Sequence, residues 1–455
     1  MADTREYPRL PEGFVFGTST ASYQIEGAVD EDGRGRSVWD TFCSEPDRIL
    51  DGSSGAVACD HYHRHAEDVA LMKGLGVDSY RFSIAWPRVQ PDGSGAANEK
   101  GLAFYDRLVD ELLAAGITPM ATLFHWDLPQ ALEDDGGWMN RDTAERFGEY
   151  AAIVAARLAD RVGHWIPVNE PNVVTFLGYG LGMHAPGKRL LFDALPVAHH
   201  LLLGHGVAVR ALREAGAQSV GTANNHTPVW AATDSAEDRE AAMAYGALWN
   251  RLFAEPMLLG RYPHGYEAGM PGPVAEDLKV IGSPLDFYGV NYYNPTRIAG
   301  PSTPAVDGDP YAGEGMPFVV LPIEGYPRTD FDWPVVPEGL RDLLVMLSQE
   351  YDGQLPPVFV TESGCAYNDE PDATGRVADQ RRIDYLDGHL RAVGQAITAG
   401  VDVRGYFTWS LIDNFEWAEG YTKRFGLVHV DFETQRRTPK DSYRWFAEMI
   451  AANRR

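Results

Sequence analysis

Eight short apolar runs, most of them followed by a segment with helical spacing, limit the folds open to this chain. The runs cover residues 14–18, 77–83, 117–124, 165–169, 219–223, 287–293, 358–362 and 405–410. Helices are expected at 62–75, 102–115, 143–159, 193–215, 236–253, 380–398 and 442–452. This alternation predicts an α/β protein, a single-domain (β/α)8 TIM barrel over residues 1–455, with parallel strands inside a ring of helices.

An open, doubly wound sheet is the main alternative architecture. It calls for a glycine-rich phosphate turn after the first strand, and Gly17-Thr18-Ser19-Thr20-Ala21 is not a G-x-G-x-x-G sequence. The segment from Pro295 to Pro337 is rich in Pro, Gly and Asp and has no clear periodicity. A loop of this length is either a linker or a functional element. Because strands and helices resume after it, we interpret it as a long βα loop over the barrel mouth.

Charge and cysteine content exclude several classes of partner. The net charge is −26, from 65 acidic and 39 basic residues, so nucleic acid and anionic membrane partners are not expected. Three widely spaced cysteines imply no disulfide framework. Met1 to Leu10 lacks an apolar core, and no uncharged apolar run reaches membrane-spanning length. We therefore expect a cytoplasmic protein with a small-molecule ligand; the oligomeric state stays open.

Two carboxylates stand at the ends of predicted strands. Glu170 ends the fourth strand before Pro171, and Glu362 ends the seventh before Gly364. The carboxyl ends of barrel strands share one face, so both side chains should border one pocket. Paired carboxylates suit glycoside hydrolysis, in which one protonates the leaving oxygen and the other attacks the anomeric carbon or activates water. Retention needs a separation of about 5–5.5 Å and inversion about 6.5–9.5 Å, and sequence spacing does not distinguish them.

Further polar and aromatic residues lie at the same strand ends. Arg81 lies inside the second strand, where a buried cation needs a carboxylate partner. Aromatic faces interleaved with hydrogen-bonding groups suit a sugar, which presents C–H faces and a rim of hydroxyls. The residues of this kind are His125, Trp126, Asn291, Tyr293, Trp409, Glu416 and Trp417.

The chain resembles glycoside hydrolase family 1, the retaining β-glucosidases and β-galactosidases, nearly from end to end. The resemblance rests on Phe14–Gly17, Tyr23–Gly27, Tyr80–Trp86, Val168–Pro171, Thr361–Gly364, Trp409–Trp417 and Phe425–Val428. It implies that Glu362 is the nucleophile and Glu170 the acid/base, with the charge of Glu362 raising the pKa of Glu170.

The resemblance also implies a set of supporting residues. Arg81 and Tyr293 would orient Glu362, and Asn169 would hold the sugar 2-hydroxyl. The implied sugar-binding residues are Gln24, His125, Asn169, Asn291, Tyr293, Trp409, Glu416 and Trp417, with Phe425 and His184 lining the pocket. Trp409 would be the platform beneath the ring. No metal or organic cofactor is implied.

Two residues depart from the family pattern. Ser363 stands where an Asn is more frequent, beside the nucleophile. Asn172 stands where many members have an aromatic residue, which puts a stacking surface for the leaving group in doubt.

The function expected first is retaining hydrolysis of terminal β-glucosyl residues from β-glucosides and cello-oligosaccharides, with β-galactosidase or β-fucosidase side activity. A second hypothesis is a 6-phospho-β-glucosidase, but Glu416 is a poor neighbour for a phosphate and Lys423-Arg424-Phe425 lacks that branch's final Tyr. A third is a sugar-binding barrel without catalysis.

Three other signals are given structural interpretations. Cys59 to His65 looks metal-like but lacks a second ligand pair. Asn225-His226-Thr227 fits a glycosylation sequon without a signal peptide to support it. Arg436-Arg437 is expected to be a solvated turn.

Overall fold

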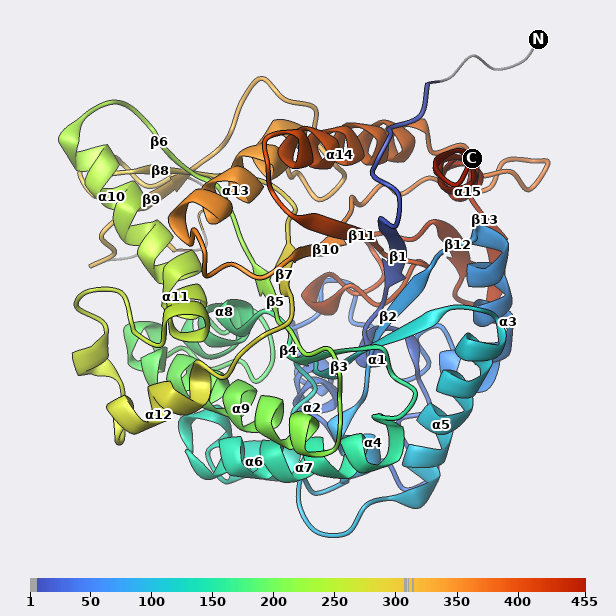
Figure 1. Ribbon diagram of the computed structural model, residues 1–455, viewed down its shortest axis with the longest axis horizontal. Coiled ribbons are helices and arrows are strands. Elements are labelled where there is room, and N and C mark those ends of the chain that lie inside the picture. Colours follow the sequence, from blue (N-terminus) through green and yellow to red (C-terminus); the bar gives the residue numbers. More distant parts are fainter. Residues whose placement is uncertain (1–5, 307–308, 310, 313–314) are drawn as a thin grey trace.

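Eight parallel strands form the centre of the computed structural model, which describes residues 6–306, 309, 311–312 and 315–455 (Figure 1). Their order around the sheet is β4-β3-β2-β1-β11-β10-β7-β5. Isolated parallel bridges from Trp165 to Val220 and from Asn169 to Ala223 join the two edge strands, so the barrel is nearly closed. The strands are β1 Val15–Ser19, β2 Ser79–Ser83, β3 Thr118–Phe124, β4 His164–Val168, β5 Ala223–Asn225, β7 Tyr288–Asn291, β10 Val358–Ser363 and β11 Val403–Trp409.

Helices surround this barrel, as predicted (Figure 1). The longer ones are α3 His61–Leu75, α5 Glu99–Ala114, α7 Asp142–Leu158, α9 Leu195–Glu214, α10 Ala236–Gly246, α11 Leu252–Leu259, α12 Val274–Ile281, α13 Pro337–Glu350, α14 Gln380–Thr398 and α15 Asp441–Asn453. Short helices are α1 Ser22–Ile25, α2 Val38–Ser44, α4 Trp86–Val89, α6 Gln130–Asp134 and α8 Pro171–Val173. The (β/α)8 prediction is thereby confirmed, whereas the assignment of 1–455 to one domain stays a prediction.

Apolar side chains fill the barrel interior below the polar strand ends. Met120, Ile166, Ala223, Phe287, Phe359 and Phe407 form one buried cluster. The rings of Phe287 and Phe359 meet edge to face, with centroids 5.4 Å apart. A Cβ on Gly17 would lie 2.3 Å from the Phe407 ring, so close packing requires glycine there.

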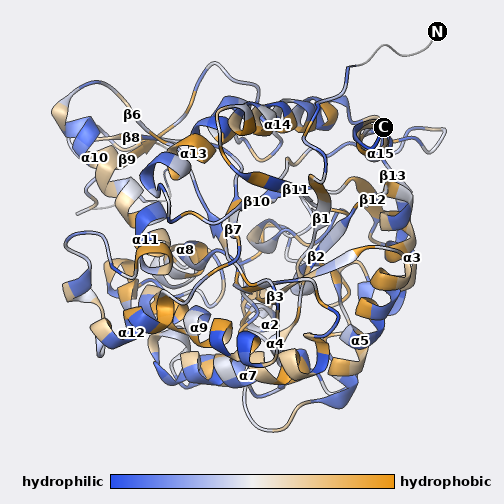
Figure 2. Cartoon of the chain, in the orientation of Figure 1, coloured by the Kyte–Doolittle hydropathy of each residue, from blue (hydrophilic) through white to orange (hydrophobic). Residues whose placement is uncertain are grey.

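The outer helices are amphipathic and bury one face against the barrel. α5 buries Leu102, Tyr105, Leu108 and Leu112, whose spacing follows the helical period. In Figure 2 such peripheral helices carry hydrophobic segments beside hydrophilic ones. Among the described residues, no helix has the length and apolar character needed to cross a membrane.

Two predicted elements differ from the observed ones. The fifth strand was expected at 219–223, but its ladder runs over Ala223–Asn225 and Val220 makes only a bridge. The helix expected at 236–253 is interrupted by the π-helical turn η4, Ala247–Arg251, before α11. Helical spacing of apolar residues does not distinguish a continuous helix from one with a π turn.

The segment from Pro295 to Pro337 is more ordered than its composition predicted. β8 (Thr296–Ala299) pairs with β9 (Val319–Leu321) and with β6 (Val229–Ala231), which makes a small sheet outside the barrel. Residues 307, 308, 310, 313 and 314 of this segment lie outside the described residues. Near its end, the Trp333 ring lies 5.3 Å from that of Tyr293, which follows β7. The prediction that the segment reaches the barrel mouth is therefore confirmed. The remaining hairpin is β12 Val428–Asp431 with β13 Arg436–Pro439.

Candidate active site

Strand register brings the two predicted carboxylates to one end of the barrel. Glu362 belongs to β10 and is the register partner of Asn291 in β7. Asn291 is in turn the partner of Asn225 in β5. Glu170 lies two residues after the end of β4 and has a left-handed φ of 47°. Both carboxylate residues are 3% exposed, so each depends on protein groups for its hydrogen bonds.

Glu362 lies between a cation and a phenol. Arg81 Nη1 donates to its Oε1 at 2.5 Å, and the Tyr293 hydroxyl donates to its Oε2 at 2.8 Å. Burial raises the pKa of Glu362, while the Arg81 charge and the Tyr293 hydrogen bond act in the opposite direction. The carboxylate partner expected for Arg81 is therefore Glu362.

Arg81 is held by further acceptors as well. It is 1% exposed and donates to Thr361 O at 3.2 Å, Thr122 Oγ1 at 3.2 Å and Asn169 Oδ1 at 2.5 Å. Guanidinium nitrogens only donate, so the contact identifies the Asn169 atom as oxygen. Arg81 thus fixes one oxygen of Glu362 and the orientation of the neighbouring amide.

Glu170 has a different environment. Its Oε1 accepts from Asn291 Nδ2 at 2.7 Å and from Asn225 Nδ2 at 3.1 Å. Among the described residues, no cationic side chain makes an ion pair with it. Burial, followed by the charge of Glu362, raises the pKa of Glu170 to about 8. Glu170 therefore holds a proton at neutral pH, while Glu362 has a cation in contact.

Asn169 and His125 form the next part of the site. Asn169 Nδ2 lies 3.0 Å from His125 Nε2, and an amide nitrogen donates, so this imidazole nitrogen accepts. The proton of the neutral ring is then on Nδ1, which is buried without a hydrogen-bond partner in the described structure. Burial and Arg81 lower the pKa of His125 well below 6.5, in keeping with a neutral ring. The Nδ1–H of His125 is therefore a buried donor without an acceptor among the described residues.

Gln24 and Glu416 form a second polar group in the site. Gln24 Nε2 donates to Phe415 O at 2.8 Å, to Asn414 Oδ1 at 3.1 Å and to Glu416 Oε2 at 3.3 Å. Gln24 Oε1 is buried and has no partner within the described residues. Burial and the charge of Glu362 raise the pKa of Glu416 to about 8. This group therefore offers both acceptors and donors to hydroxyls.

Aromatic rings pack around these polar groups. The Trp417 ring lies 4.5 Å from that of Trp126, 4.6 Å from that of Trp39 and 5.9 Å from the His125 ring. His125 also stacks on Trp409, with ring centroids 5.8 Å apart. A neutral imidazole stacked between indoles is rigid, which favours precise binding.

The predicted residues His184 and Phe425 lie in separate parts of this aromatic surround. His184 packs 5.5 Å from Trp39 and 5.6 Å from Trp126. Phe425 packs against Tyr293 and Trp333, with ring centroids 6.3 and 6.0 Å away. Trp333 stacks on Phe331 at 4.2 Å. The end of the 295–337 segment thus contributes two aromatic rings beside Tyr293.

Three residues of the site were not predicted from the sequence: Asn225, Phe331 and Trp333. Asn225 ends a three-residue strand, and its contact with Glu170 follows from strand register. Phe331 and Trp333 lie in an irregular segment without periodicity. The sequence signal that could have identified these two aromatic residues is Phe331-Asp332-Trp333, near the end of the 295–337 segment.

The signals given structural interpretations have clear partners. His61 Nδ1 bonds Asp68 at 2.7 Å and His65 Nδ1 bonds Glu111 at 2.8 Å. Within the described residues, no group of three or more His, Cys, Asp or Glu side chains is arranged to hold a metal ion. The solvated-turn prediction is wrong for Arg437, which is 8% exposed and bonds Asp68 at 3.0 Å. A buried carboxylate from α3 draws this arginine inward.

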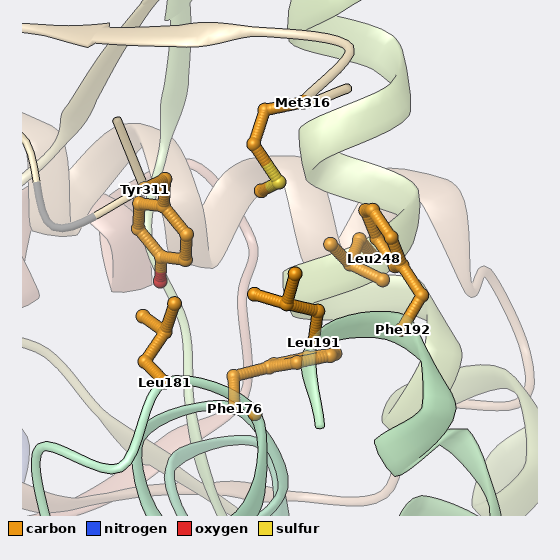
Figure 3. Close-up of a pocket in the computed structure, with 8 residues that line it drawn as sticks. Phe176, Leu181, Leu191, Phe192, Leu248, Tyr311 and Met316 are labelled. Atoms are coloured by element: carbon orange, nitrogen blue, oxygen red, sulfur yellow. The ribbon is translucent and has the colours of Figure 1, made fainter. Parts of the chain in front are cut away.

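A separate apolar pocket lies away from the carboxylates (Figure 3). Its walls come from η2 (Val174–Gly180), from the segment around Leu191, from Leu248 and from the segment that carries Tyr311 and Met316. Among the described residues that line it, none is a carboxylate or an imidazole, and Tyr311 contributes a phenol.

Comparisons with known proteins agree with this geometry. The sequence model of glycosyl hydrolase family 1 matches residues 6–455. The thermostable β-glucosidase B of Thermobispora bispora is 49% identical, over 98% of this chain and 91% of that protein. The psychrophilic β-glucosidase of Micrococcus antarcticus has a TM-score of 0.93 at 46% identity, covering 99% of this chain and 100% of that structure. The family 1 β-glucosidase of Thermotoga maritima in complex with isofagomine lactam has a TM-score of 0.92 at 42% identity. This match covers 98% of this chain and 100% of that structure. The chain therefore belongs to glycosyl hydrolase family 1 and is a glycoside hydrolase acting on O-glycosyl bonds.

Proposed function

We propose that the protein is a β-glucosidase that works by retention, with Glu362 as nucleophile and Glu170 as acid/base. The observation that carries this assignment is the contrast between the two carboxylates. Arg81 and Tyr293 contact Glu362, whereas Glu170 receives amide donors and has a pKa raised to about 8. A pair of carboxyl groups in unlike environments divides the ionised and protonated roles.

The reaction then has two steps. Ionised Glu362 attacks the anomeric carbon while Glu170 gives its proton to the leaving oxygen, which forms a glycosyl-enzyme ester. Esterification removes the charge of Glu362, and this lowers the pKa of Glu170. Glu170 can then take a proton from the water that attacks the ester, which releases the sugar with its configuration retained. Asn169, oriented by Arg81, would hold the 2-hydroxyl.

An unphosphorylated sugar fits the far side of the site better than a 6-phosphate. Glu416 is buried there beside Gln24, and neither of these side chains carries a positive charge that could balance a phosphate dianion. Lys423 Nζ donates to Asp330 O at 3.1 Å and lies 5.4 Å from the Phe331 ring centroid, so these contacts engage its charge. Acceptors and donors at Gln24, Glu416 and His125 match a ring with several hydroxyls.

The leaving group has a stacking surface despite the polar residue at position 172. Asn172 is 1% exposed and points to Asn225 O and Trp249 O. The stacked rings of Phe331 and Trp333 lie beside Tyr293 instead. Aryl β-glucosides and cello-oligosaccharides, with β-galactosides or β-fucosides as side substrates, therefore fit the proposal.

Hydrolysis of p-nitrophenyl β-glucoside, its 6-phosphate, and the matching galactoside and fucoside tests the substrate class. We expect the unphosphorylated glucoside to have the highest kcat/KM. Preference for the 6-phosphate would contradict the argument from Glu416. Binding of glucose without turnover of any of the four would favour the non-catalytic barrel. The cytoplasmic location expected from the sequence stays a prediction.

A further inference from the structure

The side chain of Asn225 is held in one orientation by Trp249. The indole Nε1 donates to Asn225 Oδ1 at 3.2 Å, while Asn225 Nδ2 lies 3.1 Å from Glu170 Oε1. An indole N–H only donates, so its partner is an oxygen. The atom of Asn225 that faces Glu170 is therefore the nitrogen.

The backbone around Asn225 and Trp249 is tied by Asn172. Asn172 Nδ2 donates to Asn225 O at 3.0 Å and lies 3.4 Å from Trp249 O. Asn172 is two residues after Glu170, so the acid/base, its donor and the donor's anchor form one linked unit. A side chain without an N–H or O–H donor at position 172 could not make these bonds.

Packing fixes the anchor itself. Trp249 lies in the π-helical turn η4 and stacks on Phe176 of the π-helical turn η2, with centroids 5.9 Å apart. It also stacks on Tyr245 at 6.1 Å. Phe176 also lines the apolar pocket of Figure 3, so apolar side chains support the Trp249 indole. π-Helical turns are frequent at functional sites, where they redirect a side chain.

The two amide donors meet the same oxygen of Glu170. Asn291 is oriented in a similar way, because Thr361 Oγ1 donates to its Oδ1 at 2.6 Å while its Nδ2 reaches Glu170 Oε1. An oxygen that accepts two N–H groups is a poor place for a proton. The acidic proton of Glu170 then belongs on Oε2.

We propose that Asn225, anchored by Trp249 and Asn172, is a positioning residue that places the transferable proton of Glu170 on Oε2. This inference rests on the proposed function, in which Glu170 is the acid. If Trp249 lost its N–H, the Asn225 amide could turn and present Oδ1 to Glu170. The proton would then be held on Oε1 by that oxygen, away from the leaving group.

Two substrates that differ in their need for an acid test this proposal. Methyl β-glucoside has an alkoxide leaving group that must be protonated, whereas 2,4-dinitrophenyl β-glucoside releases a stable phenolate. In Trp249→Phe, which keeps an aromatic ring, we expect kcat/KM for the methyl glucoside to fall about tenfold. For the dinitrophenyl glucoside it should change less than about twofold, since kcat/KM covers the steps up to the glycosyl-enzyme.

A matched control is Tyr245→Phe, which retains a ring against Trp249 and leaves the Trp249 N–H in place. It should leave both substrates near the wild-type rate. Asn225→Ala removes the donor directly and should reproduce the selective loss, which decides the matter if Trp249→Phe fails to fold. An equal loss on both substrates in both variants would overturn the inference. Wild-type enzyme that cleaves neither glucoside would instead refute the proposed function.

Discussion

Replacing Glu170 with Gln should make the folded protein more stable near neutral pH. Burial and the charge of Glu362 raise the pKa of Glu170 to about 8, from a usual value of 4.5. The unfolded chain releases this proton at a lower pH than the folded chain does. The buried Glu170 therefore costs the folded state no free energy below pH 4.5, where both states are protonated. The cost grows, and the free energy of unfolding falls, as the pH rises from 4.5 toward 8. Gln has nearly the same shape and no charge to desolvate.

The size of the effect follows from that difference in pKa. At pH 7 the folded protein still holds the proton, whereas the unfolded chain loses it about 2.5 pH units lower. This difference lowers the free energy of unfolding of the wild type by about 3 kcal/mol. The entropy of unfolding of a chain of 455 residues converts this into a rise in Tm of about 3 °C. At pH 4 both states of the wild type are protonated, and the gain should nearly disappear.

Thermal unfolding of wild type and Glu170→Gln, followed by calorimetry between pH 4 and pH 8, measures this difference. The exposed carboxylate variant Glu12→Gln serves as the control and should show no such pH-dependent gain. A variant that is no more stable than wild type at pH 7 would refute the reasoning. So would a gain in Tm that is the same at pH 4 and pH 7.

Three further substitutions test the groups around Glu362. Tyr293→Phe removes the 2.8 Å hydrogen bond to Glu362, so the pKa of Glu362 should rise and the acidic limb of the kcat/KM profile should move to higher pH. An unmoved limb would contradict the contact. Arg81→Leu leaves Glu362 buried without its cation and should lower the free energy of unfolding by about 3–5 kcal/mol, as measured by chemical denaturation. A loss below about 1 kcal/mol would argue against a buried ion pair. Gly364→Ala would place a Cβ 1.7 Å from Trp409 O, so the backbone must move and the Tm should fall. A Tm equal to that of the wild type would show that the contact relaxes without cost.

The barrel could be predicted because its strands and most of its helices have strong local signals. Parallel strands buried on both faces are continuous apolar runs, and α14 begins and ends where helical spacing predicted. The fifth strand was the weakest because its ladder is only three residues long. Short ladders depend on neighbouring strands, in this case on the pairing of Asn225 with Asn291.

The charged centre of the site could also be predicted, but its supporting contacts could not. A glutamate at the end of an apolar run and an arginine inside a strand both call for a partner, and Glu362 and Arg81 are that pair. Asn225 has no distinguishing feature in the sequence. Its position beside Glu170 follows from the pairing of β5 with β7 and from the hydrogen bond that Trp249 donates to its side chain. Arg437 looked solvated because its partner, Asp68, is 369 positions away in the chain. Long-range pairs of this kind leave no local pattern.

Azide rescue of two variants tests the division of roles between the carboxylates most directly. In Glu362→Ala, azide should attack 2,4-dinitrophenyl β-glucoside from the vacated side and give α-glucosyl azide. In Glu170→Ala, Glu362 should first form the glycosyl-enzyme, and azide should then give β-glucosyl azide. NMR of the two products distinguishes the anomers. The α product from Glu362→Ala and the β product from Glu170→Ala are the predicted result, and the reverse pairing would contradict the account.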